Sequence, residues 1–133
     1  MATEEIKYVD LADAIIIHLR LMRYFAETRY GIDHLELVES ALARPRQAAS
    51  YENADLIRQA ATLYFGLIEN HPWLGGNKRT ATVLVDEFLF INEFEVAATV
   101  EETIELVLAI ESDKFGVQEI EDWLREKTFP ISS

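Results

Sequence analysis

Two apolar segments with helical periodicity, about 54–70 and about 78–92, most strongly constrain how this chain can fold. In the first segment, apolar side chains recur every three or four residues along two neighbouring tracks, so most of the helix circumference is hydrophobic. The second segment is also largely apolar. Helices of this kind are usually central in a domain, because other elements have to cover them. We therefore expect a helical core that holds the short polar loop between these segments rigidly.

The composition agrees with a single folded domain that spans residues 1–133. Half of the residues are hydrophobic, which is too many for a disordered chain, and 5 glycines and 3 prolines leave little room for turn-rich β architecture. The absence of cysteine excludes disulfide and thiol chemistry. A net charge of −12 argues against general nucleic-acid binding, which needs clustered positive charge.

The termini and apolar runs predict a cytoplasmic protein that does not enter a membrane. The first residues are acidic, whereas the start of a signal peptide is basic. The longest apolar run is far shorter than a membrane span.

Capping residues and helix breakers predict two helices in the N-terminal third. Asp10 is expected to cap the first helix, which is expected to end at Gly31. Asp33 is expected to cap the second, which runs through Ala43 and stops at Pro45. Their apolar stripes comprise Leu11, Ile15, Leu19, Met22 and Ala26 in the first helix, and Leu35, Val38, Ala41 and Leu42 in the second.

The C-terminal third predicts a short extended stretch and two more helices. Residues 93–98 are expected to be extended over a few positions. Thr99 and Glu102 form a capping box that opens a helix to about Ile110. A last helix is expected at about 116–127. The whole pattern predicts an all-α fold, a single compact domain of about six helices.

The loop between the two apolar helices has the composition of a phosphate-handling site. Gly75 and Gly76 lie just before Asn77, Lys78 and Arg79, at the expected start of a helix. Glycine lets backbone N–H groups approach a ligand, the helix N-terminus offers unpaired donors, and the two cations add positive charge.

The residues alone also allow an ordinary helix–helix turn with solvated cations. The segment is not a P-loop, because Asn77 separates the last glycine from Lys78. His71 favours the phosphate-site interpretation, since it adds a potential proton acceptor to the same loop.

Residues 71–80, His-Pro-Trp-Leu-Gly-Gly-Asn-Lys-Arg-Thr, resemble the signature of the Fic/Doc superfamily. That signature has nine positions in this order: His; Pro or Ile; Phe; any residue; Asp or Glu; Gly or Ala; Asn; Gly or Lys; and Arg. Lys before Arg and Thr after it is similar to the Doc (death-on-curing) branch. The segments 31–32 and 37–45 and the helix leading into His71 also look Doc-like.

The Doc resemblance implies a toxin of a type II toxin–antitoxin system that transfers the terminal phosphate of ATP to a hydroxyl of a target protein, elongation factor Tu. Most Fic proteins transfer AMP instead, and often carry a second Arg three positions after the first. Thr82 occupies that position here, and together with Lys78 it favours phosphate transfer. The alternatives are a Fic-type nucleotidyl transferase and a degenerate member that binds a nucleotide or a partner without catalysis.

The resemblance also implies a role for each loop residue. His71 is the expected general base, and Lys78 and Arg79 are expected to offset the charge of the transferring phosphate. Trp73 is expected to pack under the loop rather than stack on a ligand. The residues expected to bind ATP are Gly75, Gly76, Asn77, Lys78 and Arg79.

Gly75 departs from the family signature, whose Asp or Glu at this position helps to hold Mg²⁺. Glycine offers no ligand, so Mg²⁺ is possible but weakened, and the metal ligands are unassigned. Glu69 or Asp86 is a candidate substitute, or the site works with little metal or little turnover. If Gly75 limits activity, Gly75→Asp is expected to raise activity and Mg²⁺ dependence.

The remaining histidines and the mode of inhibition complete the sequence-based expectations. His18 and His34 are expected to be structural or solvated. The inhibitory-helix motif of many Fic proteins, a Ser or Thr four residues before a Glu that Gly or Asn follows, is not found in the sequence. Inhibition is therefore expected from a cognate antitoxin that folds along an apolar channel between helices, as in Doc.

Overall fold

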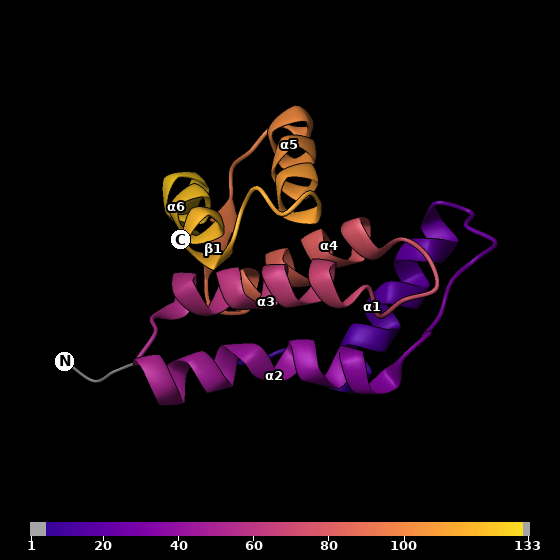
Figure 1. Cartoon of the computed structure of the whole chain (residues 1–133), viewed down its shortest axis with the longest axis horizontal. Coiled ribbons are helices and arrows are strands. Elements are labelled where there is room, and N and C mark those ends of the chain that lie inside the picture. The colour runs from indigo at the N-terminus through magenta and orange to yellow at the C-terminus, as the bar shows by residue number, and fades with distance from the viewer. Residues whose placement is uncertain (1–4, 132–133) are drawn as a thin grey trace.

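Six helices and one two-stranded sheet make up residues 5–131, the part of the chain that the computed structural model describes (Figure 1). The expected all-α fold is thus confirmed, apart from the small antiparallel sheet that pairs Phe94 with Pro130. In chain order the elements are α1 (Leu11–Tyr24), α2 (Leu35–Glu52), α3 (Leu56–Asn70), α4 (Asn77–Phe90), β1 (Phe94–Val96), α5 (Val100–Glu111), α6 (Val117–Lys127) and β2 (Thr128–Pro130).

Helix α3 is the central element, as its apolar circumference predicts. It packs against α2 on one side and against α4, α5 and α6 on the others (Figure 1). Gly66 allows α2 to approach closely, because a Cβ atom at this position would lie 3.5 Å from Ala41 Cα and 2.5 Å from Arg44 Cδ. The two helices form an antiparallel hairpin that supports the loop following α3.

Helix α2 continues through Pro45 to Glu52, so the prediction that Pro45 stops it is wrong. Proline removes one backbone donor and costs a helix interior roughly 3 kcal/mol. The buried face of α2 runs across Pro45 to Ala48, and its packing on α3 offsets that cost. The helix ends instead at Asn53, which adopts the left-handed conformation.

The connection between α1 and α2 also differs from the prediction. Helix α1 begins at the expected cap, Asp10, whose carboxylate accepts from Asp13 N at 2.8 Å, but it ends at Tyr24, well before Gly31. His34, not Asp33, occupies the N-cap position of α2. The N–H of Asp33 donates to the carbonyl oxygen of Pro72 at 2.9 Å. A tertiary contact with the loop after α3 therefore determines where α2 starts, and local capping does not.

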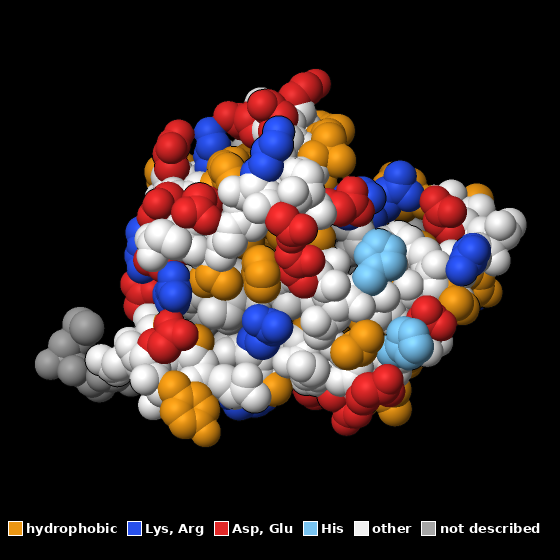
Figure 2. Space-filling model, viewed as in Figure 1, with side chains coloured by type: hydrophobic (Ala, Val, Ile, Leu, Met, Phe, Trp, Pro, Cys, Tyr) orange, Lys and Arg blue, Asp and Glu red, His pale blue; other side chains and the backbone are white. Residues whose placement is uncertain are grey.

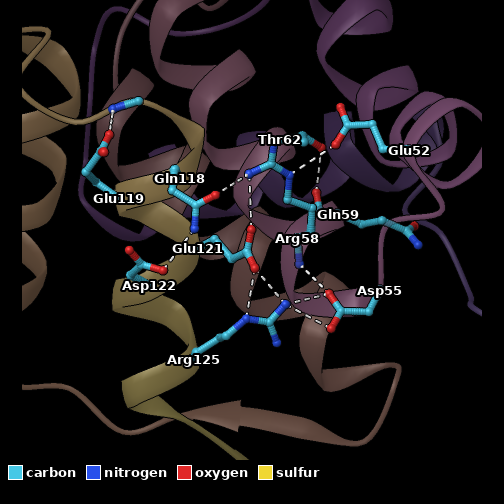
Figure 3. A network of polar contacts seen from close by, with 11 residues as sticks. Glu52, Asp55, Arg58, Gln59, Thr62, Gln118, Glu119, Glu121, Asp122 and Arg125 are labelled. Carbon is cyan, nitrogen blue, oxygen red and sulfur yellow. Dashed lines mark hydrogen bonds and ion pairs between the residues drawn. The ribbon is translucent and has the colours of Figure 1, made fainter.

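A polar network fastens α6 to the beginning of α3 (Figure 3). Glu121 lies between two guanidinium groups, 3.1 Å from Arg58 Nη1 and 2.7 Å from Arg125 Nη2. Arg125 also donates to both carboxylate oxygens of Asp55, the N-cap of α3, at 2.9 Å. The C-terminal helices are thus held to the core by ion pairs as well as by apolar packing.

The surface carries the excess of acidic side chains that the composition requires. Figure 2 shows Asp and Glu side chains spread over one face, with basic side chains between them and exposed histidine on the same face. Within residues 5–131, none of the helices combines the length and the apolar character that a membrane crossing demands.

Candidate phosphate-binding loop

The loop between α3 and α4 begins and ends at a residue in the left-handed conformation. His71 is the C-cap of α3 with φ 50° and ψ 51°, and its side chain is exposed. Gly76 is the N-cap of α4 with φ 68°, a conformation that glycine adopts without strain. Helix α4 begins at the next residue, so its unpaired N–H groups are those of Gly76, Asn77, Lys78 and Arg79.

Asn77 closes the loop on itself. Its side-chain oxygen accepts from Trp73 N, and its side-chain nitrogen donates to Trp73 O, both at 2.9 Å. Both residues are buried. The carboxamide of Asn77 is therefore engaged within the loop, which leaves the backbone of this residue to contact a ligand.

A second segment, residues 31–34, braces the loop from outside. Ile32 forms an isolated antiparallel bridge with Trp73, and Leu74 N donates to Gly31 O at 2.9 Å. The sequence offered no local signal for this pairing, because the partners are about forty residues apart. Gly31, with φ 108°, lies in this connection, whereas Ala26, with φ 53°, takes the left-handed position just after α1.

His18 of α1 supports the loop from beneath. It is fully buried; its Nδ1 lies 2.9 Å from Thr80 Oγ1, and its Nε2 accepts from Gly31 N at 3.0 Å. Since the Gly31 N–H can only donate, the neutral ring carries its proton on Nδ1. Burial lowers the pKa of His18 from 6.5 to about 4, which keeps the ring neutral. Its expected structural role is confirmed, as is the packing of Trp73 under the loop.

Both cations of the loop contact carboxylates of the same chain. Lys78 Nζ lies 2.9 Å from Glu111 Oε2, and Arg79 Nη1 lies 3.1 Å from Glu27 Oε1. The guanidinium of Arg79 also lies 3.9 Å from the centre of the Phe25 ring. These ion pairs are about half exposed, and exposed pairs contribute at most about 1 kcal/mol. A phosphate group can therefore replace the carboxylates at small cost.

The residues around the loop do not fit a Mg²⁺ site. A hydrogen bond with Asp113 raises the pKa of Glu69, which is exposed at the end of α3. Asp86 lies nine residues after Asn77, about 13 Å further along α4. Among residues 5–131, no group of three or more His, Asp or Glu side chains is placed to hold a metal ion. Neither candidate substitute for the missing carboxylate at Gly75 is thus part of such a group within residues 5–131.

Asp86 instead lines a recess further along α4. Its neighbours there include Tyr64, Thr103 and Trp123. Desolvation raises the pKa of Asp86 from 3.8 to about 6. The recess is separate from the loop, so this titration does not belong to the phosphate site. His34 is exposed between Asp33 and Glu36, as expected for a solvated histidine.

An apolar groove of about 720 Å³ opens beside the two cations. It lies between the end of α1, the start of α4 and the exposed face of α5. Lys78 and Arg79 contribute its charged end. The apolar side chains that line it include Leu21, Phe25, Val100, Ile104 and Leu108.

A glycine-containing loop, a helix N-terminus and two adjacent cations are features that many phosphate-binding proteins share. The model of the Fic/DOC family matches residues 8–89, which include α1 to α4 and the entire loop. The chain belongs to the Fic/DOC family. The family resemblance of the loop is therefore confirmed, and members of this family are nucleotide-using transferases.

Comparison with solved structures finds the BepC protein of Bartonella tribocorum, a VirB-translocated effector with bound AMPPNP. The TM-score is 0.49 with 16% sequence identity, over 71% of this chain and 50% of that protein. The chain thus matches about half the length of this relative. A search among curated proteins gives no match.

Proposed function

We propose that this chain is a Doc-like phosphotransferase that moves the terminal phosphate of ATP to a hydroxyl group of a target protein. The observation that carries the proposal is the hydrogen bonding of Thr82, which lies three residues after Arg79. Its hydroxyl donates to Lys78 O at 3.0 Å and lies 2.7 Å from Tyr64 Oη. At this position the chain therefore has a hydroxyl group that is hydrogen-bonded within the protein, and it lacks the second arginine. This difference supports phosphate transfer over AMP transfer.

The chemistry requires a base at one end of the loop and cations at the other. His71 accepts the proton of the target hydroxyl as its oxygen attacks the γ-phosphorus. The bond between that phosphorus and the β–γ bridging oxygen breaks, and ADP leaves. Backbone N–H groups at the start of α4, together with Lys78 and Arg79, stabilise the negative charge of the transferring group. The exposure of His71 suits a macromolecular substrate.

The groove beside Lys78 and Arg79 supports a role as the toxin of a toxin–antitoxin pair. An apolar channel between helices suits a partner segment that folds on binding, and the two cations call for an acidic residue within that segment. We propose that a cognate antitoxin binds here in the cytoplasm. The proposed target, by resemblance to Doc, is elongation factor Tu.

Incubation with a cell lysate and ATP labelled at the γ or the α position tests this function. The proposal predicts protein labelling from γ-³²P-ATP alone. Labelling from α-³²P-ATP would indicate nucleotidyl transfer, and no labelling from either would indicate a member that binds without turnover.

A pair of histidine variants ties any labelling to the loop. His71→Ala is expected to abolish labelling, because the base is lost. His34→Ala is the matched control, since it removes an exposed histidine outside the loop, and it is expected to retain full labelling. Undiminished labelling by His71→Ala would contradict the proposed mechanism.

A further inference from the structure

Gly75, where the family signature has a metal-binding carboxylate, has no room for a side chain in this protein. A Cβ atom at Gly75 would overlap the carbonyl oxygen of Arg29 and lie 3.4 Å from its carbonyl carbon. Backbone atoms cannot move aside as a flexible side chain can. The residues 31–34 that follow are also fixed to the loop by the bridge between Ile32 and Trp73. An aspartate at Gly75 is therefore expected to displace backbone of this loop rather than to supply a metal ligand.

The residue that closes this space is itself a cation. The Cβ of Arg29 would lie 3.9 Å from a Cβ at Gly75, so its side chain begins beside the loop. Arg29 is exposed and takes part in none of the ion pairs found among residues 5–131. Its long stem and forked guanidinium suit a phosphate.

We propose that the phosphate site of this protein works without a divalent metal, and that Arg29 serves as a third cation beside Lys78 and Arg79. This inference rests on the proposed function and specifies its ligand as a metal-free polyphosphate such as free ATP. A metal-free triphosphate carries more negative charge than its Mg²⁺ complex. Three side-chain cations and a helix N-terminus are complementary to that additional charge.

Titration calorimetry with ATP, in EDTA and in excess Mg²⁺, tests the metal requirement directly. Wild-type protein is expected to bind ATP in EDTA at least as tightly as in Mg²⁺. Binding that needs Mg²⁺ would overturn this inference and leave the proposed function standing. Absence of binding in both buffers would overturn both.

Arg29→Gln tests the named cation, with Lys7→Gln as a control of equal charge change. Lys7 contacts Asn92 beyond the C-terminal end of α4, whereas the loop lies at its N-terminal end, about 20 Å away. Arg29→Gln is expected to weaken binding in EDTA about tenfold, and Lys7→Gln less than about twofold. Equal effects of the two variants, both with wild-type melting temperatures, would refute the role of Arg29.

Gly75→Ala and Gly75→Asp distinguish the steric effect of a side chain at this position from the effect of a carboxylate. Both variants introduce a Cβ against Arg29 O, so both are expected to weaken ATP binding to a similar extent. If Gly75→Asp gained Mg²⁺-dependent binding that Gly75→Ala lacked, the metal-free account would be wrong.

Discussion

The imidazole of His18 lies parallel to the indole of Trp73, with ring centroids 4.2 Å apart and 14° between the ring planes. Trp73 belongs to the loop, whereas His18 belongs to the first helix, and both are buried. The same imidazole contacts Thr80 on α4 and Gly31 in the bracing segment. One side chain therefore connects the four parts of the chain that determine the position of the loop.

His18→Leu is expected to reduce both stability and its dependence on pH. The folded-state pKa of about 4 lies below the unfolded value of 6.5, so the unfolded state binds the proton first as pH falls. Wild-type stability should therefore decrease between pH 6.5 and pH 4, by up to about 3 kcal/mol from this group. Urea unfolding at several pH values measures the difference between the two proteins. An equal pH dependence in both would contradict the account.

Asn77→Ala is expected to loosen the loop, because two buried backbone groups of Trp73 lose their partner. The cost should be about 2–3 kcal/mol, with faster hydrogen exchange of the Trp73 amide. Asn70→Ala is a suitable comparison, since it removes one hydrogen bond, to Leu37 O, away from Trp73. It should cost less and leave the Trp73 amide protected. Unchanged exchange in Asn77→Ala would show that another contact holds the loop.

Asp86→Asn is expected to stabilise the protein at pH 8 and to have little effect near pH 4. The folded-state pKa of Asp86 is raised to about 6. Relative to the charged form, the neutral carboxyl group therefore stabilises the folded state below pH 3.8, and this stabilisation is lost as pH rises through 6. Above that range the wild type bears the cost of a desolvated charge that asparagine avoids. Urea midpoints at the two pH values measure the gain. Glu105→Gln on exposed α5 is the charge-matched control, and an equal gain there would exclude desolvation as the cause.

Glu121→Gln is expected to destabilise the protein by about 2 kcal/mol, whereas Glu27→Gln should change stability by less than about 0.5 kcal/mol. The side chain of Glu121 is 13% exposed and serves two arginines, while that of Glu27 is 40% exposed and pairs only with Arg79 among the described residues. Thermal unfolding of the two variants provides the comparison. Equal losses would mean that burial does not distinguish these ion pairs.

The fold was predictable wherever local chemistry determines it. Asp10 and the Thr99 capping box satisfy N–H groups within their own helices, and the starts of α1 and α5 follow from them. The start of α2 was not predictable, because contacts with the loop after α3 determine it. The end of α1 was not predictable because Ala26, and not a glycine, takes the left-handed conformation there, with Glu27 N donating to Met22 O. The predicted end of α2 at Pro45 was wrong for a related reason. Packing of α2 on α3 outweighs the helix-breaking tendency of proline.

The candidate site shows the same division between local and tertiary information. The loop and its expected residues were visible in the sequence as one short segment, and the family match includes all of them. Their roles in binding and catalysis remain predictions. Glu27 and Arg29 gave no signal, because they lie in the connection after α1 and meet the loop only in the folded structure.

The central claim is that the start of α4 binds the phosphate groups of a nucleotide. Titration of ¹⁵N-labelled protein with a non-hydrolysable ATP analogue, followed by amide chemical shifts, tests it most directly. The account predicts that the largest shifts occur at Gly75, Gly76, Asn77, Lys78 and Arg79, and that a Lys78→Gln, Arg79→Gln double variant loses them. No shifts, or shifts confined to residues around the recess at Asp86, would contradict it.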